Sequence, residues 1–287
     1  MKDKKILCIC EDNGMGYNYF VKYLKKIANV EVATETKTPI IQSYDYIILF
    51  ECDKVKLSRF LTLTKMLPST TKKVFFSQDP HINLDMHKYI VQTHAFDAII
   101  TTQKNAVKEF ETLKKPTLHC TWGYDPEINK DLELKRVYDL GIAGTLNPFL
   151  HPMRCSILTR LSKEFNIFPI AEVKESDVSK VYSSSKIGFN YAISDDVNFR
   201  IFETIASGCL LLTDDKPLNN GLKDLFEPGK DFVVYKEKSY KDLTDKIKYY
   251  LDNPEEAKAI IKSASEKIKI HTYENRAKDI ISFLEKL

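Results

Sequence analysis

The stretch Asn190 to Leu212, NYAISDDVNFRIFETIASGCLLL, decides the fold of this chain. A polar loop leads into a segment whose apolar side chains recur at helical spacing, at Phe199, Phe202, Ile205 and Ala206. Gly208 then ends the helix, because glycine adopts a left-handed backbone conformation without strain. The apolar run that follows, Cys209–Leu212, is typical of a buried strand. A loop, a helix and a buried strand in this order indicate an α/β unit.

The same alternation of short apolar runs and helical patterns continues from end to end, as expected for parallel strands joined by crossover helices. The strands predicted in the first half are Lys5–Cys10, Val30–Ala33, Tyr46–Phe50, Lys73–Ser77, Ala98–Thr101 and Thr117–Cys120. Those predicted in the second half are Tyr138–Ala143, Asn166–Ile170, Ile187–Tyr191, Cys209–Leu212 and Phe232–Tyr235.

One stretch, Tyr124–Lys135, interrupts the alternation with a proline and a run of charges and is predicted to be a linker. We therefore predict an α/β protein with an N-terminal domain at 1–124, a linker at 125–135, a second domain at 136–271 and a C-terminal helix within 272–287. Two α/β halves imply a ligand-binding cleft between them.

The composition excludes several classes of protein. The chain has 287 residues, of which 43% are hydrophobic and 29% charged, so it can bury a core and is neither disordered nor fibrous. A net charge of +3 is too small to indicate a nucleic-acid-binding protein. No apolar run is long enough for a signal peptide or a membrane span, and the six cysteines are scattered without metal-binding spacing. These features predict a cytoplasmic protein with reduced thiols.

The small excess of basic residues lies in the N-terminal half. The predicted helix Tyr17–Ala28 carries Lys22, Lys25 and Lys26. Such a helix could contact an anionic acceptor or a membrane surface peripherally. A solvated helix face explains the same lysines.

Two turns in the first half are candidate binding or catalytic positions. Gly14, Met15 and Gly16 follow the first strand, where glycines let a ligand approach the backbone, or simply allow a tight turn. The third glycine of a dinucleotide fingerprint is missing, which argues against an oxidoreductase. Asp79 and His81 follow the fourth strand at the edge where α/β sheets bind ligands, and either could act as a base.

The second half carries the candidate anion-binding residues. Small and polar residues follow its first strand, namely Gly144, Thr145 and Asn147, and a helix bearing Arg154 comes next. Backbone N–H groups and guanidiniums together can hold a phosphate. Arg200 supplies a second guanidinium, two residues after Asn198. Glu203 lies among apolar neighbours, so its carboxylate needs hydrogen-bond donors, which a vicinal diol provides.

The pattern Asn198-x-Arg200-x-Phe202-Glu203, followed by Ala206-x-Gly208 and a run of leucines, resembles the C-terminal domain of GT-B glycosyltransferases, in particular the CgeB-like branch of the group 1 transferases. The resemblance extends over 138–287. In the first half only Asp79-Pro80 and the segment Phe96–Thr101 match that branch.

The resemblance implies two Rossmann-like domains facing each other across a cleft, with the C-terminal helix crossing back to the N-terminal domain. It implies a transferase that moves a sugar from a nucleotide diphosphate, most simply a UDP-sugar, to an acceptor hydroxyl with retention. Glu203 would bind the ribose, Ile170 would line the donor site, and Asp195 would lie near the donor sugar in place of the glutamate of the family's motif.

The sequence contains no Asp-x-Asp motif, so we expect neither a metal nor a tightly bound cofactor. Phosphate charge would then be stabilised by Arg154, Arg200 and backbone donors. The acceptor stays open among a glycan, a protein and a hydroxymethylated DNA base. Because Asp195 replaces a glutamate and the family's lysine after Gly144 is missing, the alternative is a non-catalytic nucleotide-sugar-binding protein.

Overall fold

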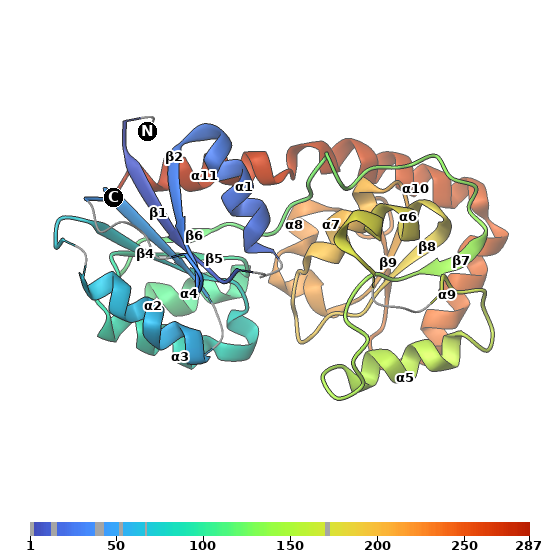
Figure 1. The fold of residues 1–287 in the computed structure, drawn as a ribbon. Coiled ribbons are helices and arrows are strands. Elements are labelled where there is room, and N and C mark those ends of the chain that lie inside the picture. The colour runs from blue at the N-terminus through green and yellow to red at the C-terminus, as the bar shows by residue number, and fades with distance from the viewer. Residues whose placement is uncertain (1–2, 13–15, 38–42, 52–53, 67, 170–172) are drawn as a thin grey trace. The chain divides into compact units, whose positions relative to one another are not determined.

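The computed structural model of this chain describes residues 3–12, 16–37, 43–51, 54–66, 68–169 and 173–287. Contacts divide the chain into two compact units (Figure 1). Unit 1 consists of Met1–Trp122 and Tyr273–Leu287, and unit 2 consists of Gly123–Thr272. No helix in the described ranges combines the length and apolarity needed to cross a membrane.

Unit 1 is built on a parallel sheet of strand order β2-β1-β3-β4-β5-β6. Its strands are β1 (Lys5–Ile9), β2 (Asn29–Ala33), β3 (Tyr46–Phe50), β4 (Lys72–Ser77), β5 (Ala98–Thr101) and β6 (Thr117–His119). Its helices are α1 (Tyr17–Ile27), α2 (Lys54–Met66), α3 (Pro80–Thr93), α4 (Lys104–Glu111) and α11 (Tyr273–Leu284).

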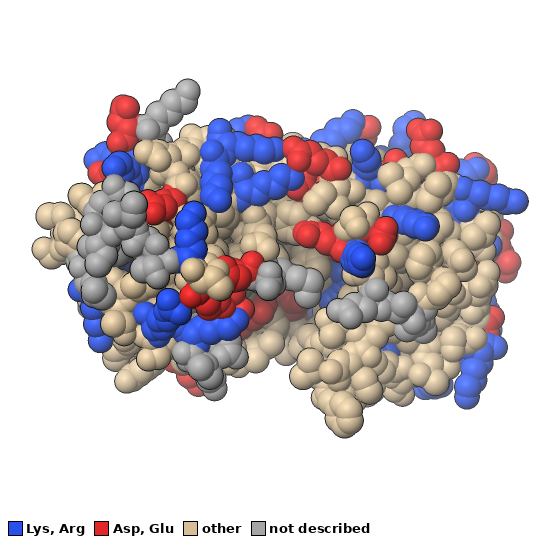
Figure 2. Space-filling model, viewed as in Figure 1, with Lys and Arg blue, Asp and Glu red and all other residues tan. Residues whose placement is uncertain are grey.

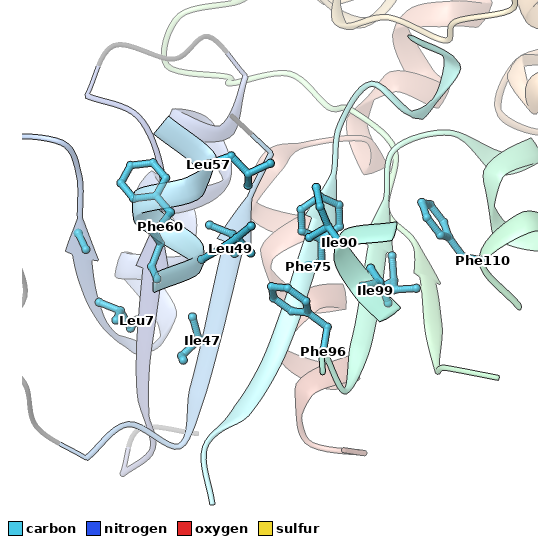
Figure 3. Close-up of a cluster of buried hydrophobic side chains, with 14 of the residues drawn as sticks. Leu7, Ile47, Leu49, Leu57, Phe60, Phe75, Ile90, Phe96, Ile99 and Phe110 are labelled. Carbon is cyan, nitrogen blue, oxygen red and sulfur yellow. The ribbon is translucent and has the colours of Figure 1, made fainter. Parts of the chain in front are cut away.

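One face of this sheet packs against α2, α3 and α4 (Figure 3). Alternate residues of the strands point toward these helices because side chains alternate between the two faces of a strand. Leu49 and Phe75 of the sheet lie in one buried cluster with Phe60 of α2, Ile90 of α3 and Phe110 of α4. Apolar burial of this extent is the main stabilising contribution to such a unit.

The opposite face is covered by α1 and by α11, which comes from the far end of the chain. Their side chains form an aromatic cluster in which Phe20 lies 4.9 Å from Phe76 and 5.1 Å from Tyr273 between ring centroids. Tyr19 stacks on Tyr273 at 4.7 Å. The last residues of the chain therefore complete the core of unit 1.

Helix α1 turns its polar side away from this core. Lys25 and Lys26 are exposed there, and Lys22 is half-buried. Lys and Arg atoms gather over α1 in Figure 2, beside acidic residues. The ammonium groups of Lys22 and Lys26 lie 5.3 and 4.4 Å from the Tyr23 ring centroid, so part of their charge is satisfied within the helix.

Unit 2 is built on a parallel sheet of strand order β10-β9-β8-β7. Its strands are β7 (Tyr138–Gly141), β8 (Ser185–Asn190), β9 (Leu210–Asp214) and β10 (Val233–Tyr235). Its helices are α5 (Pro152–Leu161), α6 (Val178–Ser183), α7 (Phe199–Ala206), α8 (Leu222–Leu225), α9 (Tyr240–Asp252) and α10 (Pro254–Lys267). Short 3-10 turns are η1 (Glu175–Asp177), η2 (Lys216–Asn220) and η3 (Ile268–Ile270).

The segment 125–135 is fixed to unit 2 by hydrogen bonds. Lys130 N–H donates to Ser179 Oγ at 3.0 Å, and Leu132 N–H donates to Ser183 Oγ at 3.0 Å. Both serines belong to α6. This segment is therefore a strap along α6, and it has no regular secondary structure over its charged part.

The strand expected at Asn166–Ile170 does not form within the described residues. There, Ile167 makes an isolated parallel bridge to Leu140 of β7. Pro169 has no N–H to donate to the strand ladder, which explains why pairing stops. Ile170 lies outside the described residues.

Gly188 of β8 lies directly against Thr204 of α7. A Cβ at this position would lie 2.3 Å from Thr204 Cγ2 and 3.2 Å from Tyr182 Cδ1. We expect Gly188→Ala to lower the free energy of unfolding by about 1–3 kcal/mol, because Thr204 is β-branched and cannot turn aside easily. Chemical denaturation measures this, and adding Thr204→Ala should restore part of the loss. An equal loss in the single and double variants would contradict the packing explanation.

Candidate functional site

The polar groups of unit 2 gather where β7, β8 and β9 end, at the carboxyl edge of the sheet. Parallel α/β sheets bind their ligands at this edge. Helix α7 starts there after the polar loop 191–198, and α5 starts there after the loop that follows β7. Three strand ends and two helix N-termini thus surround one region of unit 2.

Arg200, in the first turn of α7, is buried with only 6% of its surface exposed. Its Nη1 donates to Asn190 Oδ1 at 3.4 Å, while its buried Nε has no hydrogen-bond partner. A Cβ on Gly144 would lie 3.2 Å from this Nε, and the Gly144 φ of +152° also favours glycine. Gly144 therefore leaves the space in which the guanidinium lies against the backbone.

Arg154, near the start of α5, is the second buried guanidinium. It donates from Nη1 to Thr145 O at 3.0 Å and from Nη2 to Tyr191 O at 3.2 Å, and its Nε is buried without a partner. Burial, together with the nearby charge of Arg200, lowers the pKa of Arg154 to about 10. Within the described residues neither arginine forms an ion pair with a carboxylate, so this region attracts an anionic ligand.

Glu203 lies one turn further along α7 and is buried, with 5% of its surface exposed. Burial raises the pKa of Glu203 to about 7, although the positive charge of Arg200 opposes the shift. Burial and the charge of Glu203 in turn raise the pKa of Tyr182 to about 12. Among the described residues no hydrogen bond to the Glu203 carboxylate is found, so the group is poised to accept donors from a ligand.

Asn198, directly before α7, adds a further group of this kind. Both its Nδ2 and its Oδ1 are buried and have no hydrogen-bond partner in the described structure. Buried polar groups are paired in nearly all native structures. An amide that is buried and unpaired beside Arg200 indicates a ligand contact.

A pocket of about 290 Å³ opens beside Arg154. It is lined by Leu150, His151, Pro152, Met153, Arg154, Tyr191, Ala192, Ile193, Ser194, Lys216 and Glu237. Burial, followed by the charges of Arg154 and Arg200, lowers the pKa of His151 and so favours its neutral form. The lining combines apolar and polar side chains, as ligand sites usually do.

Asp214, at the end of β9, fixes one wall of this pocket. Its Oδ2 accepts the Ala192 N–H at 2.6 Å, and its Oδ1 accepts the Lys216 N–H at 3.1 Å. Burial raises the pKa of Asp214 to about 6, although these N–H donors and the Lys216 charge oppose the shift. The carboxylate joins the loop after β8 to the turn after β9.

The structure brings together several of the residues expected from the sequence, namely Gly144, Arg154, Asn198, Arg200 and Glu203. Thr145 takes part through its carbonyl oxygen. The Asn147 Oδ1 accepts the N–H groups of Phe149 and Leu150 at 2.9 and 3.3 Å and so stabilises its own turn. Ile170 cannot be placed because it lies outside the described residues.

Asp195 is half-buried and is not among the residues that line the pocket. Its carbonyl oxygen accepts Asn220 Nδ2 at 3.1 Å. Lys216 and Glu237 line the pocket but were not predicted from the sequence. Their position just after the strands β9 and β10 was the available signal.

In unit 1, Asp79 lies in the turn after β4, and His81 lies in the first turn of α3, which follows. Glu51 fixes this turn, since its Oε2 accepts the N–H groups of Gln78 and Asp79, both at 2.8 Å. Glu51 Oε1 lies 3.0 Å from His87 Nε2, and His87 Nδ1 lies 2.9 Å from Ser77 Oγ. Burial opposes ionisation of Glu51, but its contact with His87 and the two N–H donors outweigh burial and lower its pKa.

The side chains on this turn differ in exposure. Asp79 is exposed, whereas His81 is half-buried and its buried Nδ1 has no partner in the described structure. Gly16, with φ +92°, is covered by Trp122, since a Cβ there would lie 2.6 Å from the indole. Gly14 and Met15 lie outside the described residues.

Comparison with known protein families matches residues 133–282 to the family described as glycosyl transferase-like. This match covers just over half of the chain. The chain therefore belongs to the glycosyl transferase-like family. None of the curated proteins matches it significantly.

Solved structures show the same fold. HepE of Anabaena, solved in complex with UDP and glucose, superimposes with a TM-score of 0.74 at 13% identity, covering 99% of this chain and 100% of that chain. Sucrose-phosphate synthase from Thermosynechococcus elongatus gives 0.72 at 11% identity, covering 99% and 98%. An alpha-glucosyltransferase in complex with UDP-glucose and DNA containing an abasic site gives 0.66 at 11% identity, covering 98% and 99%.

These matches give the chain the α/β fold with parallel sheets of GT-B glycosyltransferases. The expected general family is thereby confirmed, and the CgeB-like branch stays a prediction. No group of three or more metal-ligating side chains occurs among the described residues. Chemistry without a metal likewise stays a prediction from the sequence.

Replacing Glu203 by glutamine should stabilise the protein in the absence of ligand. The folded-state pKa is about 7 against an ordinary value of 4.5, so the folded chain holds its proton more tightly than the unfolded chain. The contribution of the protonated Glu203 carboxyl group to folding stability is therefore fully present below about pH 4.5 and is lost as the pH rises through 7. We expect Glu203→Gln to raise the free energy of unfolding by up to ~3 kcal/mol at about pH 8 and to change it little at about pH 5.

Urea unfolding at the two pH values measures the difference between wild type and variant. Glu255→Gln, at an exposed position on α10, is the matched control and should change stability little at either pH. If Glu203→Gln raised the free energy of unfolding equally at both pH values, the raised pKa of Glu203 would be contradicted.

Proposed function

We propose that this chain is a glycosyltransferase that moves a sugar from a nucleotide diphosphate sugar, with a UDP-sugar as the first candidate, to an acceptor hydroxyl. The observation that carries the proposal is the pair of buried guanidiniums of Arg154 and Arg200, each with an unpartnered Nε. UDP and UDP-glucose are bound in solved relatives of the same fold, which supports this choice of donor.

The arginines would act on the diphosphate. In the reaction, the bond from the anomeric carbon to a diphosphate oxygen breaks while a bond to the acceptor oxygen forms. The leaving diphosphate gains negative charge and can take up the acceptor's hydroxyl proton. Guanidiniums that are already fixed in place by Thr145, Tyr191 and Asn190 stabilise this charge without reorganising.

Glu203 and Asn198 would hold the nucleoside. A carboxylate accepts hydrogen bonds from both hydroxyls of a ribose, and the Glu203 carboxylate has the burial that makes such donors valuable. The amide of Asn198 has both a donor and an acceptor to offer. Asp195 stays our candidate for a contact to the reacting sugar, with Gly144 and Thr145 beside the phosphates.

The transfer would retain the configuration of the anomeric carbon, and the enzyme would need neither a metal ion nor a tightly bound cofactor. If the reaction instead inverted the anomeric centre, a base would be required, and Asp79 and His81 would be the candidates. Glu51 holds their turn in place, which suits such a role.

The domain assignment is part of this proposal. Residues 1–124 would bind the acceptor, with Gly14, Met15 and Gly16 at its edge, 125–135 would link the domains, and 136–271 would bind the donor. The helix at 272–287 would belong with the acceptor domain, which the packing of α11 on α1 supports. We place the protein in the cytoplasm, in keeping with the free cysteines among its described residues.

The acceptor is most simply a hydroxyl of a glycan or a protein. The carboxyl edge of the unit 1 sheet is rich in carboxylates, at Glu11, Asp12, Glu35, Glu51 and Asp79. Lys56 pairs with two of them, Glu11 at 3.1 Å and Glu35 at 2.6 Å. This edge is unfavourable for a DNA backbone, whose binding depends on cations that neutralise phosphates. The lysines of α1 keep a peripheral membrane contact open.

A non-catalytic nucleotide-sugar-binding protein is the alternative, because Asp195 replaces a glutamate and does not line the pocket. Turnover separates the two. The wild-type chain is incubated with UDP-sugars and free UDP is measured, with and without oligosaccharide acceptors. Release of UDP above that of an Arg200→Lys control supports the transferase, whereas tight binding without any release supports the alternative.

Arg200→Lys should weaken UDP binding by roughly 10- to 100-fold, since lysine loses the fork of donors that meets a diphosphate. Isothermal calorimetry measures the dissociation constant. Arg160→Lys on the exposed face of α5 is the control and should leave it unchanged. Because the assigned partner is the diphosphate, uridine affinity should change little in Arg200→Lys. A similar loss for UDP and uridine would contradict the assignment.

UDP affinity should also rise with pH as Glu203 ionises. The ribose hydroxyls donate to the carboxylate and so favour its charged form, whose folded-state pKa is about 7 without ligand. We expect about a tenfold gain in affinity between about pH 6 and pH 8, absent in Glu203→Gln. Calorimetry over this range tests it. An unchanged affinity would remove Glu203 from the ribose contact.

A further inference from the structure

The pocket beside Arg154 has one polar wall that the nucleotide assignment leaves unused. Lys216, just after β9, and Glu237, just after β10, form it together. The Lys216 Nζ lies 3.3 Å from Glu237 Oε1. Their side chains are only 18% and 26% exposed, so the pair is held inside the pocket rather than on the open surface.

The ammonium of Lys216 is fixed in position by three neighbours. It donates to the carbonyl oxygen of Ala192 at 2.6 Å and lies 4.0 Å from the Tyr191 ring centroid. The Asp214 Oδ1 lies 3.9 Å from this ammonium nitrogen and also accepts the Lys216 backbone N–H at 3.1 Å. A lysine restrained in this way loses little further side-chain entropy when a ligand binds.

Glu237 presents acceptor capacity next to this donor. Its Oε1 accepts the Tyr191 hydroxyl at 3.3 Å, a long bond, and its N–H donates to Asp215 Oδ1 at 3.2 Å. For its Oε2 no hydrogen-bond partner is found in the part of the chain that the structure describes. An ammonium and a carboxylate side by side match neighbouring hydroxyls, each of which both donates and accepts.

The same pair disfavours the other ligand chemistries. Glu237 would repel a phosphate or a carboxylate placed against this wall. An aliphatic or aromatic ligand would leave the two charges desolvated and unpaired. The lining also includes the apolar side chains of Leu150, Pro152, Met153 and Ile193, which suit the C–H face of a ring. The pocket therefore fits an uncharged, polyhydroxylated ring.

We propose that Lys216 and Glu237 bind hydroxyls of the sugar ring of the donor and so help to set which sugar is transferred. This rests on the proposed function. Arg154 lines the same pocket and belongs to the anion-binding pair, so a ring in the pocket lies next to the diphosphate to which it is attached.

The test compares the affinity of each protein for UDP and for UDP-sugars by calorimetry. UDP-glucose, UDP-galactose and UDP-N-acetylglucosamine serve as probes, and the one that wild type binds most tightly relative to UDP is carried forward. We expect Glu237→Gln and Lys216→Met each to reduce this sugar-dependent gain by about fivefold or more, while UDP affinity changes less than about twofold.

The matched controls are Glu255→Gln and Lys258→Met, an exposed ion pair on α10 with Nζ to Oε1 at 2.7 Å. They should leave both affinities as in wild type. The UDP affinity of each variant also reports whether unit 2 is folded.

Three results would overturn the subsite. The first is a wild type that binds UDP but gains nothing from any attached sugar. The second is that Glu237→Gln and Lys216→Met both keep the wild-type gain in affinity for the UDP-sugar over UDP. The third is a loss of UDP and UDP-sugar affinity in equal proportion, which would indicate a structural role. Failure of wild type to bind UDP or any UDP-sugar would instead contradict the proposed function itself.

Discussion

Two like-charged guanidiniums buried together are the constraint on which unit 2 depends. Arg154 and Arg200 interact unfavourably, and within the described residues neither is neutralised by an ion pair. Their desolvation is compensated through carbonyl oxygens of the loops that follow β7 and β8 and through the amide oxygen of Asn190 at the end of β8. The loops are consequently shaped around the arginines, and the free protein keeps a positive region that an anion relieves.

Function and stability are opposed at this edge. The Glu203 carboxylate, the Asn198 amide and the two Nε atoms would each be better hydrated in an unfolded chain. A fold can keep such groups only if the core beneath them contributes enough stabilising free energy to offset their desolvation. Burial of the leucine-rich strand β9 and of the apolar face of α7 makes this contribution. Functional sites of other proteins likewise carry strained or unpaired groups, and the rest of the fold offsets their cost.

Local signals in the sequence were enough for much of the fold and part of the site. Helix α7 was predictable because its apolar spacing and the glycine at 208 lie within ten residues of each other. Arg200 and Glu203 followed, because one turn of that helix fixes their separation. The strand predicted at Asn166–Ile170 was wrong because a proline limits pairing there. Asn147 stays a prediction: its Oδ1 stabilises a turn, and asparagine stabilises turns as readily as it binds ligands. Lys216 and Glu237 were missed because the order of strands in the sheet, which makes the ends of β9 and β10 neighbours, is not written in any local pattern.

Helix α11 has a consequence for how the chain is made. Tyr273, Ala277, Ile280 and Leu284 fill the core of unit 1 but are synthesised after all of unit 2. Until they emerge, Tyr19 and Phe20 of α1 lack the ring contacts that Tyr273 makes with them. During synthesis the sequence of unit 2 is therefore complete before that of unit 1, to which Tyr273–Leu287 belongs. Quality control in the cell would therefore meet the N-terminal half in its incomplete form for longest.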